Sequence, residues 1–569
     1  MDIPVLVIGG GPTGLAAALF LGRLGVPALL ADRRHATSAV PRATHVSRRS
    51  MELFRAAGIE DDIRRTGFEV VREDDPRTRT EPARVLPRVV LEAGSLARVR
   101  TAGVLETGHE ELAVPGPCPP YWLGQDLMEP LLARAAGRAG ADVRPGHEVI
   151  GLDLAPDGAL ARIRCLDTGR MFTVRSRYVI GADGKRGPTA RWSGIAHHGL
   201  GTVARRVSIL FRADLSRLVG ERRFFMCMIE NPGFSGAVME LNTPGRWAAA
   251  VDYDPRLAGP DGRYPAATCL RLVRAAIGDP GTDARIDTVF RWEARHRLAT
   301  RYRAGPVFLI GDAAHLHPPA GGYGSNVGFQ DAHNLAWKLA AVLRGWAGED
   351  LLDTYEAERR PVGAATAEQS LLLDGIPPES LGGATRCDPR TLLMGYRYHS
   401  AAILGTPPGG PFPPAFGLTG EPGTRLPHLW WRTPRGRRIS TLDLCTDGFA
   451  LLSADPTAVR AADDAARETG VPLRGHHLPA PRGELAQHDA DFAHTAGTGR
   501  FGAVLVRPDG MVAWRVTSDV PLPESALRSR LSRILRRVLA LPAAAPHRLP
   551  ADRCPLTLAE HFPDLWERT

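Results

Sequence analysis

Glycines and a carboxylate near the N-terminus have the spacing of a site for a phosphate-bearing cofactor. Gly9, Gly11 and Gly14 form the pattern Gly-x-Gly-x-x-Gly, and Asp32 follows 18 residues after Gly14. In such a motif the glycines allow a tight turn, close approach of the backbone to a pyrophosphate, and close packing of a helix on a strand. An acid at about this distance binds a ribose hydroxyl. The pattern alone leaves NAD, NADP and FAD open.

Two later stretches also bring an acid and glycines to the end of an apolar run. Residues 178–184 end in Gly-Ala-Asp-Gly, with the acid at Asp183, and residues 306–315 contain Gly311-Asp312. A glycine-rich loop at 318–326 follows, just before a predicted long helix over 327–343. Open α/β sheets bind ligands at the carboxyl ends of their strands. Three such strands therefore predict one large dinucleotide site.

Hydrophobic patterning predicts the elements that must position these residues. Residues 2–8 and 26–32 are apolar runs typical of buried strands, and the Ala/Leu-rich segment between them has helical spacing. Alternating residues later in the chain predict a mixed-sheet substrate domain with a helix over 266–277, and a Pro/Gly-rich stretch at 406–414 precedes a small α/β unit. The predicted boundaries are 1–70, 100–190 and 291–395 for the nucleotide-binding domain, 71–99 and 191–290 for the substrate domain, and 415–569 for the C-terminal domain.

Composition excludes several classes of protein. The net charge is +9, but only Lys185 and Lys338 are lysines, so 71 − 2 = 69 basic residues are arginines, interspersed with acids rather than clustered. We therefore expect no nucleic-acid binding. No stretch approaches the ~18 apolar residues of a membrane span, and the N-terminus lacks a secretory signal, so we expect a cytoplasmic protein. The expected oligomeric state is a monomer or homodimer. The seven scattered cysteines include no C-x-x-C pair, which predicts neither a disulfide framework nor a metal site.

Taken together, the motifs resemble those of the single-component FAD-dependent aromatic hydroxylases, the class A flavoprotein monooxygenases, and most of all the polyketide hydroxylases of antibiotic biosynthesis. The resemblance is carried by the three glycine motifs and by residues after the third, namely Asp331, Asn334, Leu335, Trp337, Lys338 and Leu339. It covers roughly residues 1–365. The C-terminal region resembles the thioredoxin-like domain of the family, which typically lacks the redox cysteine pair.

The resemblance implies an α/β fold with a Rossmann-like FAD-binding domain, an inserted mixed-sheet substrate domain and a C-terminal thioredoxin-like domain. It also implies that NAD(P)H, with NADPH favoured, reduces FAD, that O2 then gives a C4a-hydroperoxide, and that one oxygen is transferred to a polycyclic aromatic polyketide. The cofactor carries this chemistry, so no catalytic side chain is predicted. The substrate-pocket candidates are Tyr323, Phe224 and Trp122. Structural roles are expected for His45, His315 and His317.

Cofactor contacts are also assigned by the resemblance. Asp32 would hold the adenosine ribose, and Asp312 would form a hydrogen bond to the ribityl chain. The 322–326 loop, called the flavin loop below, would present N–H groups to the flavin pyrimidine edge. A helix N-terminus there would stabilise the negative charge of reduced flavin. The predicted FAD-binding residues are Gly9, Gly11, Pro12, Thr13, Gly14, Asp32, Arg33, Arg42, Gln125, Asp183, Gly311, Asp312, Pro319, Gly322, Gly324, Ser325 and Asn326.

The sequence departs from the family pattern in two places and leaves alternative functions open. Lys185 follows Gly184 where the family commonly has arginine, and Tyr323 stands in the flavin loop where the family often has Gln or a small residue. One alternative is Baeyer–Villiger or multi-step oxygenation and rearrangement of the same substrates. Another is a non-catalytic FAD-binding partner protein. The Trp-x-Trp-x-Ile-Pro signature of flavin halogenases is missing.

Overall fold

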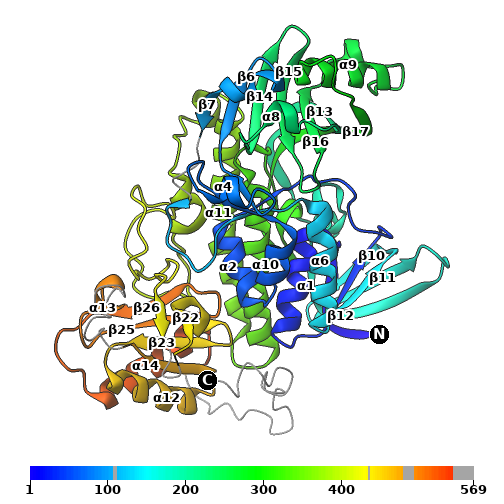
Figure 1. Ribbon diagram of the computed structural model, residues 1–569. Coiled ribbons are helices and arrows are strands. Elements are labelled where there is room, and N and C mark those ends of the chain that lie inside the picture. Colours follow the sequence, from blue (N-terminus) through cyan, green and yellow to red (C-terminus); the bar gives the residue numbers. More distant parts are fainter. Residues whose placement is uncertain (107–111, 433–435, 479–491, 543–569) are drawn as a thin grey trace.

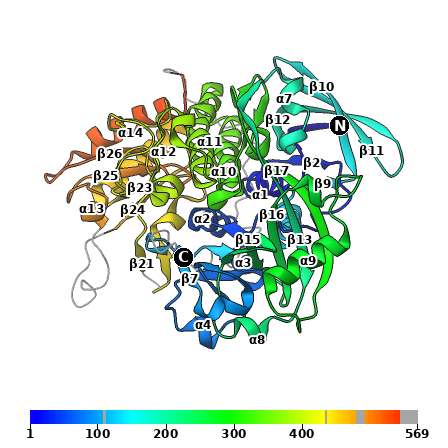
Figure 2. The same cartoon turned by 90° about the horizontal axis from the view of Figure 1, so that it is seen from above.

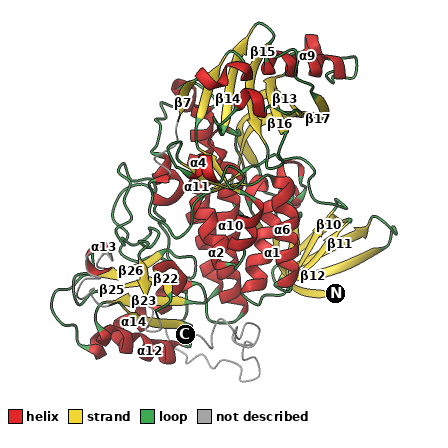
Figure 3. Ribbon diagram, in the orientation of Figure 1, coloured by secondary structure: helices red, strands yellow, loops and turns green. Residues whose placement is uncertain are grey.

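The structure, a computed structural model, describes residues 1–106, 112–432, 436–478 and 492–542. Three regions lie side by side (Figure 1). Long helices gather in the central region, whereas the region above it and the C-terminal region are rich in strands (Figure 3). Seen from above, the C-terminal elements lie next to α10 and α11, on the side of the molecule opposite the β10–β11 hairpin (Figure 2).

The central region contains a mixed sheet of eight strands in the order β10-β11-β12-β1-β2-β9, with β19 paired to β12 and β18 paired to β19. β1 (Asp2–Ile8) lies between β2 (Ala28–Asp32) and β12 (Met171–Gly181) and is parallel to both. The last four residues of β1 and of β12 and the first four of β2 are buried, as parallel strands covered on both faces require. The other strands are β9 (Asp142–Pro145), β10 (His147–Ala155), β11 (Gly158–Cys165), β18 (Arg303–Ala304) and β19 (Val307–Leu309).

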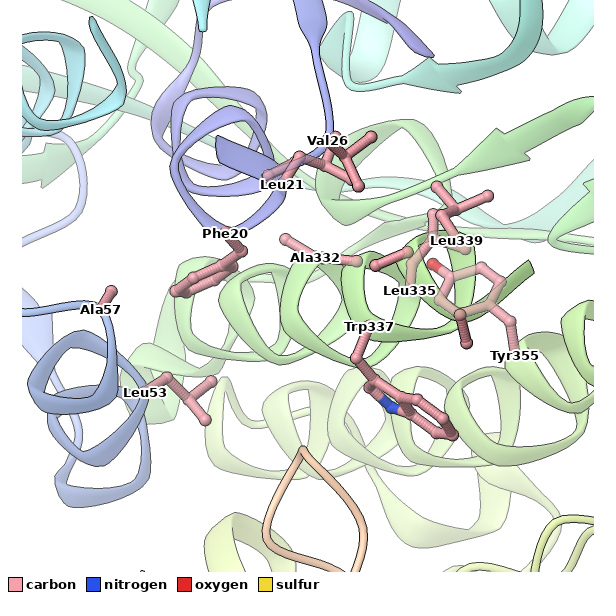
Figure 4. Packing of buried hydrophobic residues seen from close by; sticks show 14 of the residues in the cluster. Phe20, Leu21, Val26, Leu53, Ala57, Ala332, Leu335, Trp337, Leu339 and Tyr355 are labelled. Carbon is pink, nitrogen blue, oxygen red and sulfur yellow. The ribbon is translucent and has the colours of Figure 1, made fainter. Parts of the chain in front are cut away.

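Helices cover this sheet and pack on one another. In Figure 4, Phe20 and Leu21 of α1 face Ala332 and Leu335 of α10 within one buried apolar cluster. Trp337 lies on the side of α10 that faces away from α1 (Figure 4). The helices are α1 (Pro12–Arg23), α2 (Arg48–Ala56), α3 (Glu60–Thr66), α6 (Gln125–Arg138), α7 (Thr189–Trp192), α10 (Tyr323–Leu343) and α11 (Asp353–Leu373).

The upper region is built on a second eight-stranded sheet in the order β20-β17-β13-β16-β15-β14-β6-β7. Helix α9 (Ala266–Ile277) packs its apolar face on this sheet, in agreement with the predicted helix. The strands are β6 (Val90–Ala93), β7 (Gly103–Glu106), β13 (His197–Arg212), β14 (Met226–Asn231), β15 (Phe234–Glu240), β16 (Arg246–Asp252), β17 (Arg285–Ala299) and β20 (His315–Leu316), and α8 spans Ser216–Val219.

A small sheet joins the two regions in the order β3-β8-β4-β5. Its strands are β3 (His45–Val46), β4 (Phe68–Val71), β5 (Val85–Pro87) and β8 (Tyr121–Trp122), and α4 spans Arg77–Thr80. The predicted substrate segment 71–99 is therefore divided, because β5 belongs to this small sheet and β6 to the upper sheet.

The C-terminal region has a four-stranded sheet in the order β24-β23-β25-β26, with β24 parallel to β23 and the other pairs antiparallel. Its chain order is a β-α-β unit followed by two strands and a helix, which agrees with the predicted α/β unit. The elements are β21 (Trp430–Arg432), β22 (Arg438–Ser440), β23 (Phe449–Ser453), α12 (Pro456–Thr469), β24 (Leu473–His477), α13 (Phe492–Thr495), β25 (Ala503–Val506), β26 (Val512–Val516) and α14 (Glu524–Val538).

Two predicted element boundaries differ from the structure. The strand predicted to end at Gly311-Asp312 ends at Leu309, since Gly311 has φ +56° and turns the chain. The helix predicted from residue 327 begins four residues earlier, at Tyr323, because Gly322 takes a left-handed conformation (φ +65°) and ends the preceding turn. Within the described residues, no helix is both long enough and apolar enough to cross a membrane.

Candidate functional site

Register in the central sheet brings the three predicted acidic motifs to one edge. Ile8 pairs with Ala31 of β2 and with Gly181 of β12, and Gly181 pairs in turn with Leu309 of β19. All four strands are parallel, so the residues that follow them emerge at the same edge. Gly9, Asp32, Asp183 and Asp312 therefore lie around a common site.

Contacts around each glycine explain why the first motif needs glycines. A Cβ atom on Gly9, which has φ +107°, would lie 2.4 Å from the carbonyl oxygen of Ala182, and one on Gly14 would lie 2.0 Å from the carbonyl oxygen of Gly9. By contrast, a Cβ atom on Gly11 would meet nothing within 4 Å. Gly11 precedes Pro12, the first residue of α1, so open space lies over the helix N-terminus, where a pyrophosphate binds best.

Thr13 joins the first motif to the third. A Cβ atom on Gly311 would lie 2.8 Å from Thr13 Oγ1, and one on Gly328 would lie 2.5 Å from it. The Thr13 side chain thus fills the space that both glycines leave, where α1 meets α10. Gly328 was not among the predicted site residues, because a glycine inside a helical pattern carries no motif.

Asp32 is held at the sheet edge by a network that includes a basic residue outside the predicted set. Its carboxylate accepts hydrogen bonds from the Gly10 N–H (2.9 Å) and from the Arg34 guanidinium (2.9 and 3.1 Å). Arg34 also donates to the Gly10 carbonyl (2.8 Å) and to buried Glu129 of α6 (3.2 Å). Arg33, one of the predicted FAD-binding residues, is exposed.

Asp183 and Asp312 differ in their surroundings. Asp183 Oδ2 accepts hydrogen bonds from the Thr189 backbone N–H (2.9 Å) and hydroxyl (2.6 Å), while its buried Oδ1 has no partner among the described residues. No hydrogen bond from the described residues reaches the Asp312 side chain, and this residue is accessible to solvent. Desolvation by burial raises the pKa of both carboxyls above their usual range.

Several basic residues lie close enough to Asp312 to affect its pKa. The charges of His315, Lys185, Arg297 and Arg42 oppose the rise in the pKa of Asp312. Arg297 is half-buried, and its Nε has no hydrogen-bond partner among the described residues. Lys185 is a departure from the family pattern, but it still brings a positive charge to this place.

Asn326 fixes the flavin loop to the rest of the site. It is fully buried, its Oδ1 accepts from the Ser47 N–H (2.9 Å) and the Ser50 hydroxyl (2.7 Å), and its Nδ2 donates to the carbonyls of His45 (3.0 Å) and Gly322 (2.8 Å). These bonds use its amide completely. Asn326 therefore shapes the loop, whereas the backbone N–H groups at the start of α10 remain available to a ligand.

The other predicted contacts lie around the same edge. Gln125 begins α6 and donates to Glu129 (2.7 Å), the carboxylate that also binds Arg34. Arg42 and Pro319 are exposed, and Gly324 and Ser325 are partly exposed in the first turn of α10. The predicted set is thus gathered around one site, with Arg33 and Arg42 at its exposed margin.

The three substrate-pocket candidates occupy different environments. Tyr323 is buried in an apolar cluster with Val114 and residues 392–394, and Phe224 lies in the core of the upper region beside Trp247. Both positions are those of packing residues. Trp122 is buried where the small sheet meets the upper region, edge-on to Phe225 at 4.5 Å, and its Nε1 has no acceptor among the described residues. Trp122 is therefore the strongest of the three candidates.

Histidines and cysteines take structural positions. His315 Nε2 lies 2.6 Å from Asp331 Oδ2, and Asp331 also accepts from the N–H of Gly311 (3.1 Å) and from Arg359 (2.8 Å). Burial lowers the pKa of His317 well below its usual value, which leaves it neutral. Six described cysteines are free, burial raises the pKa of Cys445 to about 12, and Cys554 lies outside the described residues. No metal-binding group of side chains occurs in the described part of the chain.

The arrangement fits a dinucleotide. Space over Gly11, an unpartnered oxygen on Asp183, an accessible Asp312 and a second helix N-terminus at Tyr323 lie along one sheet edge. An extended ligand with a phosphate-bearing middle and hydroxyl groups on both sides matches these donors and acceptors. The residues that sequence reasoning missed, Arg34 and Glu129, are 95 positions apart, and no local spacing relates them.

Comparison with known proteins gives the same assignment. Residues 2–370 match the family model described as "FAD binding domain", and residues 419–538 match "Aromatic-ring hydroxylase, C-terminal". The chain is 41% identical to tetracenomycin A2 monooxygenase-dioxygenase of Streptomyces glaucescens, over 95% of this chain and 98% of that protein. It is 35% identical to aklavinone 12-hydroxylase RdmE of Streptomyces purpurascens, over 95% of this chain and 99% of that one.

Solved structures agree with these relatives. The crystal structure of a ternary complex of aklavinone-11 hydroxylase with FAD and aklavinone matches with a TM-score of 0.82 and 33% identity, over 95% of this chain and 99% of that one. The flavin-dependent monooxygenase PieE, in complex with FAD and substrate, matches with a TM-score of 0.80 and 32% identity, over 95% of this chain and 100% of that one. The chain therefore belongs to the FAD-dependent aromatic-ring hydroxylases, and its relatives include the polyketide hydroxylases.

Proposed function

We propose that this enzyme uses NAD(P)H and O2 to hydroxylate a polycyclic aromatic polyketide at a resident FAD. The observation that carries the proposal is the convergence of Gly11, Asp183, Asp312 and the N-terminus of α10 on one edge of the central sheet. When bound, FAD supplies the activation of O2 and the transfer of oxygen to an electron-rich ring. The protein supplies binding, orientation and exclusion of water.

Individual residues have distinct parts in this proposal. Asp32, kept in place by Arg34, would accept a hydrogen bond from a ribose hydroxyl. Asp312 would accept a hydrogen bond from a hydroxyl of the ribityl chain. Free N–H groups in the first turn of α10 would face the flavin pyrimidine edge, where negative charge develops on reduction. Trp122, which is buried edge-on to Phe225, would contribute its unpartnered indole N–H as a donor toward a substrate.

The cationic groups near Asp312 support a phosphate-bearing co-substrate. The pKa of Lys185 is lowered, chiefly by burial. Asp312 opposes this shift, and the neighbouring charges of Arg186, Arg295 and Arg42 add to it. Cations held close together repel one another, and an anion that binds among them is attracted to all of them. NADPH is the favoured donor over NADH, and comparison of the two donors tests this preference directly.

A second candidate is multi-step oxygenation of the same class of substrate. The relative from Streptomyces glaucescens, at 41% identity, is named a monooxygenase-dioxygenase, and this name supports the alternative. Baeyer–Villiger insertion belongs to the same alternative, because it starts from the same reduced flavin and O2. Counting the labelled oxygen atoms in the product separates these outcomes from a single hydroxylation.

The test uses the purified, FAD-loaded enzyme with a panel of polycyclic phenols that includes aklavinone and 1,8-dihydroxyanthraquinone. We expect NADPH oxidation to be faster with an accepted phenol, and mass spectrometry after reaction under ¹⁸O2 to find one labelled hydroxyl group. Two or more labelled atoms would favour multi-step oxygenation, and a lactone would favour Baeyer–Villiger insertion. Protein that binds no FAD, or whose NADPH oxidation no phenol stimulates, would refute the proposal.

A further inference from the structure

A turn of the C-terminal region inserts two charged side chains between α10 and α11. Arg507 is fully buried, and its two terminal nitrogens donate to the two carboxylate oxygens of Glu358 on α11, at 2.6 and 2.8 Å. Its Nε donates to Asp509 of the same turn, at 3.1 Å. This two-pronged geometry fixes orientation as well as distance, which a single point charge does not.

The same two carboxylates are shared with α10. Glu358 accepts from Lys338 (2.8 Å) and Asn334 (2.7 Å), and Asp509 accepts from the indole N–H of Trp337 (3.2 Å). Asn334, Trp337 and Lys338 recur at the spacing of one helix face. Figure 4 shows the Trp337 ring on the side of α10 that faces away from α1. The family motif at these positions therefore belongs to the contact with the C-terminal region rather than to the cofactor.

Charges in this cluster balance, and the C-terminal turn adds one cation and one anion to the pair of Lys338 and Glu358. The cations Arg507 and Lys338 are matched by the anions Glu358 and Asp509, and all four are buried. Without the turn, Lys338 and Glu358 would remain as a single pair. Burial lowers the pKa of Lys338 to about 8, although Glu358 opposes the shift, so this pair is strongly desolvated. Buried ion clusters contribute little net stability compared with apolar packing, and in some proteins they specify one arrangement of the parts, which is the role we infer for this cluster.

A second contact ties the turn to α2. Arg49 donates to the backbone carbonyl of Asp509 (2.6 Å) and to Glu52 (2.9 Å), and Glu52 also binds buried Arg425. The same N-terminal end of α2 also contacts the start of α10, because Ser47 and Ser50 donate hydrogen bonds to Asn326. The C-terminal turn is thus connected to Asn326 through α2. Asn326 and Asn334 are two turns apart on α10, roughly 12 Å along its axis.

We propose that the turn containing Arg507 and Asp509 is a positioning element for the flavin. It sets the mutual position of α10 and α2, and these two helices together determine where the N–H groups of the 322–326 loop lie. The inference rests on the proposed binding of FAD at this edge of the sheet. It gives the C-terminal region a part in cofactor binding that needs no redox cysteine.

The test compares Arg507→Lys, which keeps the charge but loses the two-pronged contact, with wild-type enzyme. Asp509→Asn is the second variant, and it decides the matter if Arg507→Lys fails to fold. The control is Arg460→Gln, which removes an exposed ion pair with Glu524 inside the C-terminal region. Circular dichroism establishes folding, titration of flavin fluorescence gives the FAD affinity, and visible spectra report the flavin environment.

We expect the folded variants to bind FAD about tenfold more weakly, a typical size for coupling between distant sites, and to show a shifted visible flavin band. The Arg460→Gln control should match wild type in both measurements. Folded variants that bind FAD as tightly as wild type, with an identical spectrum, would overturn the inference and leave the cluster with a structural role alone. Failure of the wild-type protein itself to bind FAD would instead overturn the proposed function.

Discussion

Three carboxylates follow neighbouring strands in this site, yet their hydrogen-bond partners differ. Asp32 accepts hydrogen bonds from Gly10 and Arg34, Asp183 accepts only from Thr189, and Asp312 accepts nothing from the described residues. An acceptor that is desolvated but unpaired gains most from a ligand hydroxyl. Asp312 is therefore the single residue on which cofactor binding should depend most.

Replacing Asp312 with alanine should weaken FAD binding by about 10- to 100-fold, because a buried hydrogen bond of about 1–3 kcal/mol is lost. The flavin-to-protein absorbance ratio after gel filtration measures the effect. Asp252→Ala is a suitable control, since the Asp252 side chain is 85% exposed and lies on a strand of the upper sheet. An Asp312→Ala protein that purifies with a full complement of FAD would contradict the assignment.

Arg33 and Arg34 make a matched pair of neighbours with opposite surroundings. Arg34 bridges Asp32, the Gly10 carbonyl and Glu129, whereas Arg33 is exposed. We expect Arg34→Gln to lower FAD affinity about fivefold or more, because Asp32 loses its orientation, and Arg33→Gln to leave it nearly unchanged. Equilibrium titration of the two apoproteins with FAD gives the comparison. Equal losses in both would show that Arg33 contacts the nucleotide.

At the scale of elements, the first turn of α10 depends on a segment almost 280 residues earlier in the chain. Asn326 bonds to Ser47, Ser50 and the His45 carbonyl, so β3, α2 and the flavin loop form one unit. The adjacent Ser325 is only partly buried. Asn326 therefore contributes more to the structure than its neighbour Ser325 does.

Asn326→Ala should destabilise the protein by about 2–3 kcal/mol, since it leaves buried donors and acceptors unpaired, and it should also weaken flavin binding. Ser325→Ala should change stability by no more than about 0.5 kcal/mol. Chemical denaturation of both apoproteins, followed by flavin titration, checks the pair. If Asn326→Ala unfolds like wild type, the proposed role of the amide in fixing the loop is wrong.

Much of this arrangement could be predicted from the sequence, because strand, glycine turn and helix are local patterns. The parallel strands that lead to Asp32, Asp183 and Asp312 were predicted with their motifs, and the register confirmed that they share an edge. The partners of these residues could not be predicted. Arg34 is one of 69 arginines, and only the fold brings it to Glu129. Likewise, no sequence spacing relates Arg507 to Glu358.

At the scale of the whole molecule, buried ion pairs connect the C-terminal region to the central one. Burial alone would raise the pKa of Glu52, but Arg425 and Arg49 lower it below its usual value, and Arg507 and Lys338 act in the same way on Glu358. The folded protein therefore binds protons at these carboxyls less readily than the unfolded chain does. Their stabilising effect is present above about pH 4.5 and is lost as the pH falls below it.

The Glu52→Gln variant should be less stable than wild type at pH 7, by about 3–5 kcal/mol, because Arg49 and Arg425 lose their buried counter-charge. It should also lose less of its remaining stability than wild type does between pH 5 and about pH 3.5. Thermal melting of both proteins over this range, at constant ionic strength, measures the difference. Parallel stability curves for the two proteins would mean that Glu52 does not contribute to the acid sensitivity.

The position of β1 in the middle of its sheet has a consequence for synthesis on the ribosome. Its neighbours are β2, which follows directly after α1, and β12, which is made about 170 residues later, while α10 is made later still. The nucleotide site thus cannot be completed when its glycine motif leaves the exit tunnel, and contacts between such distant segments form slowly. The apolar face of the first helix must stay protected until residues 323–343 have emerged, so the nascent chain should need chaperone assistance during this interval.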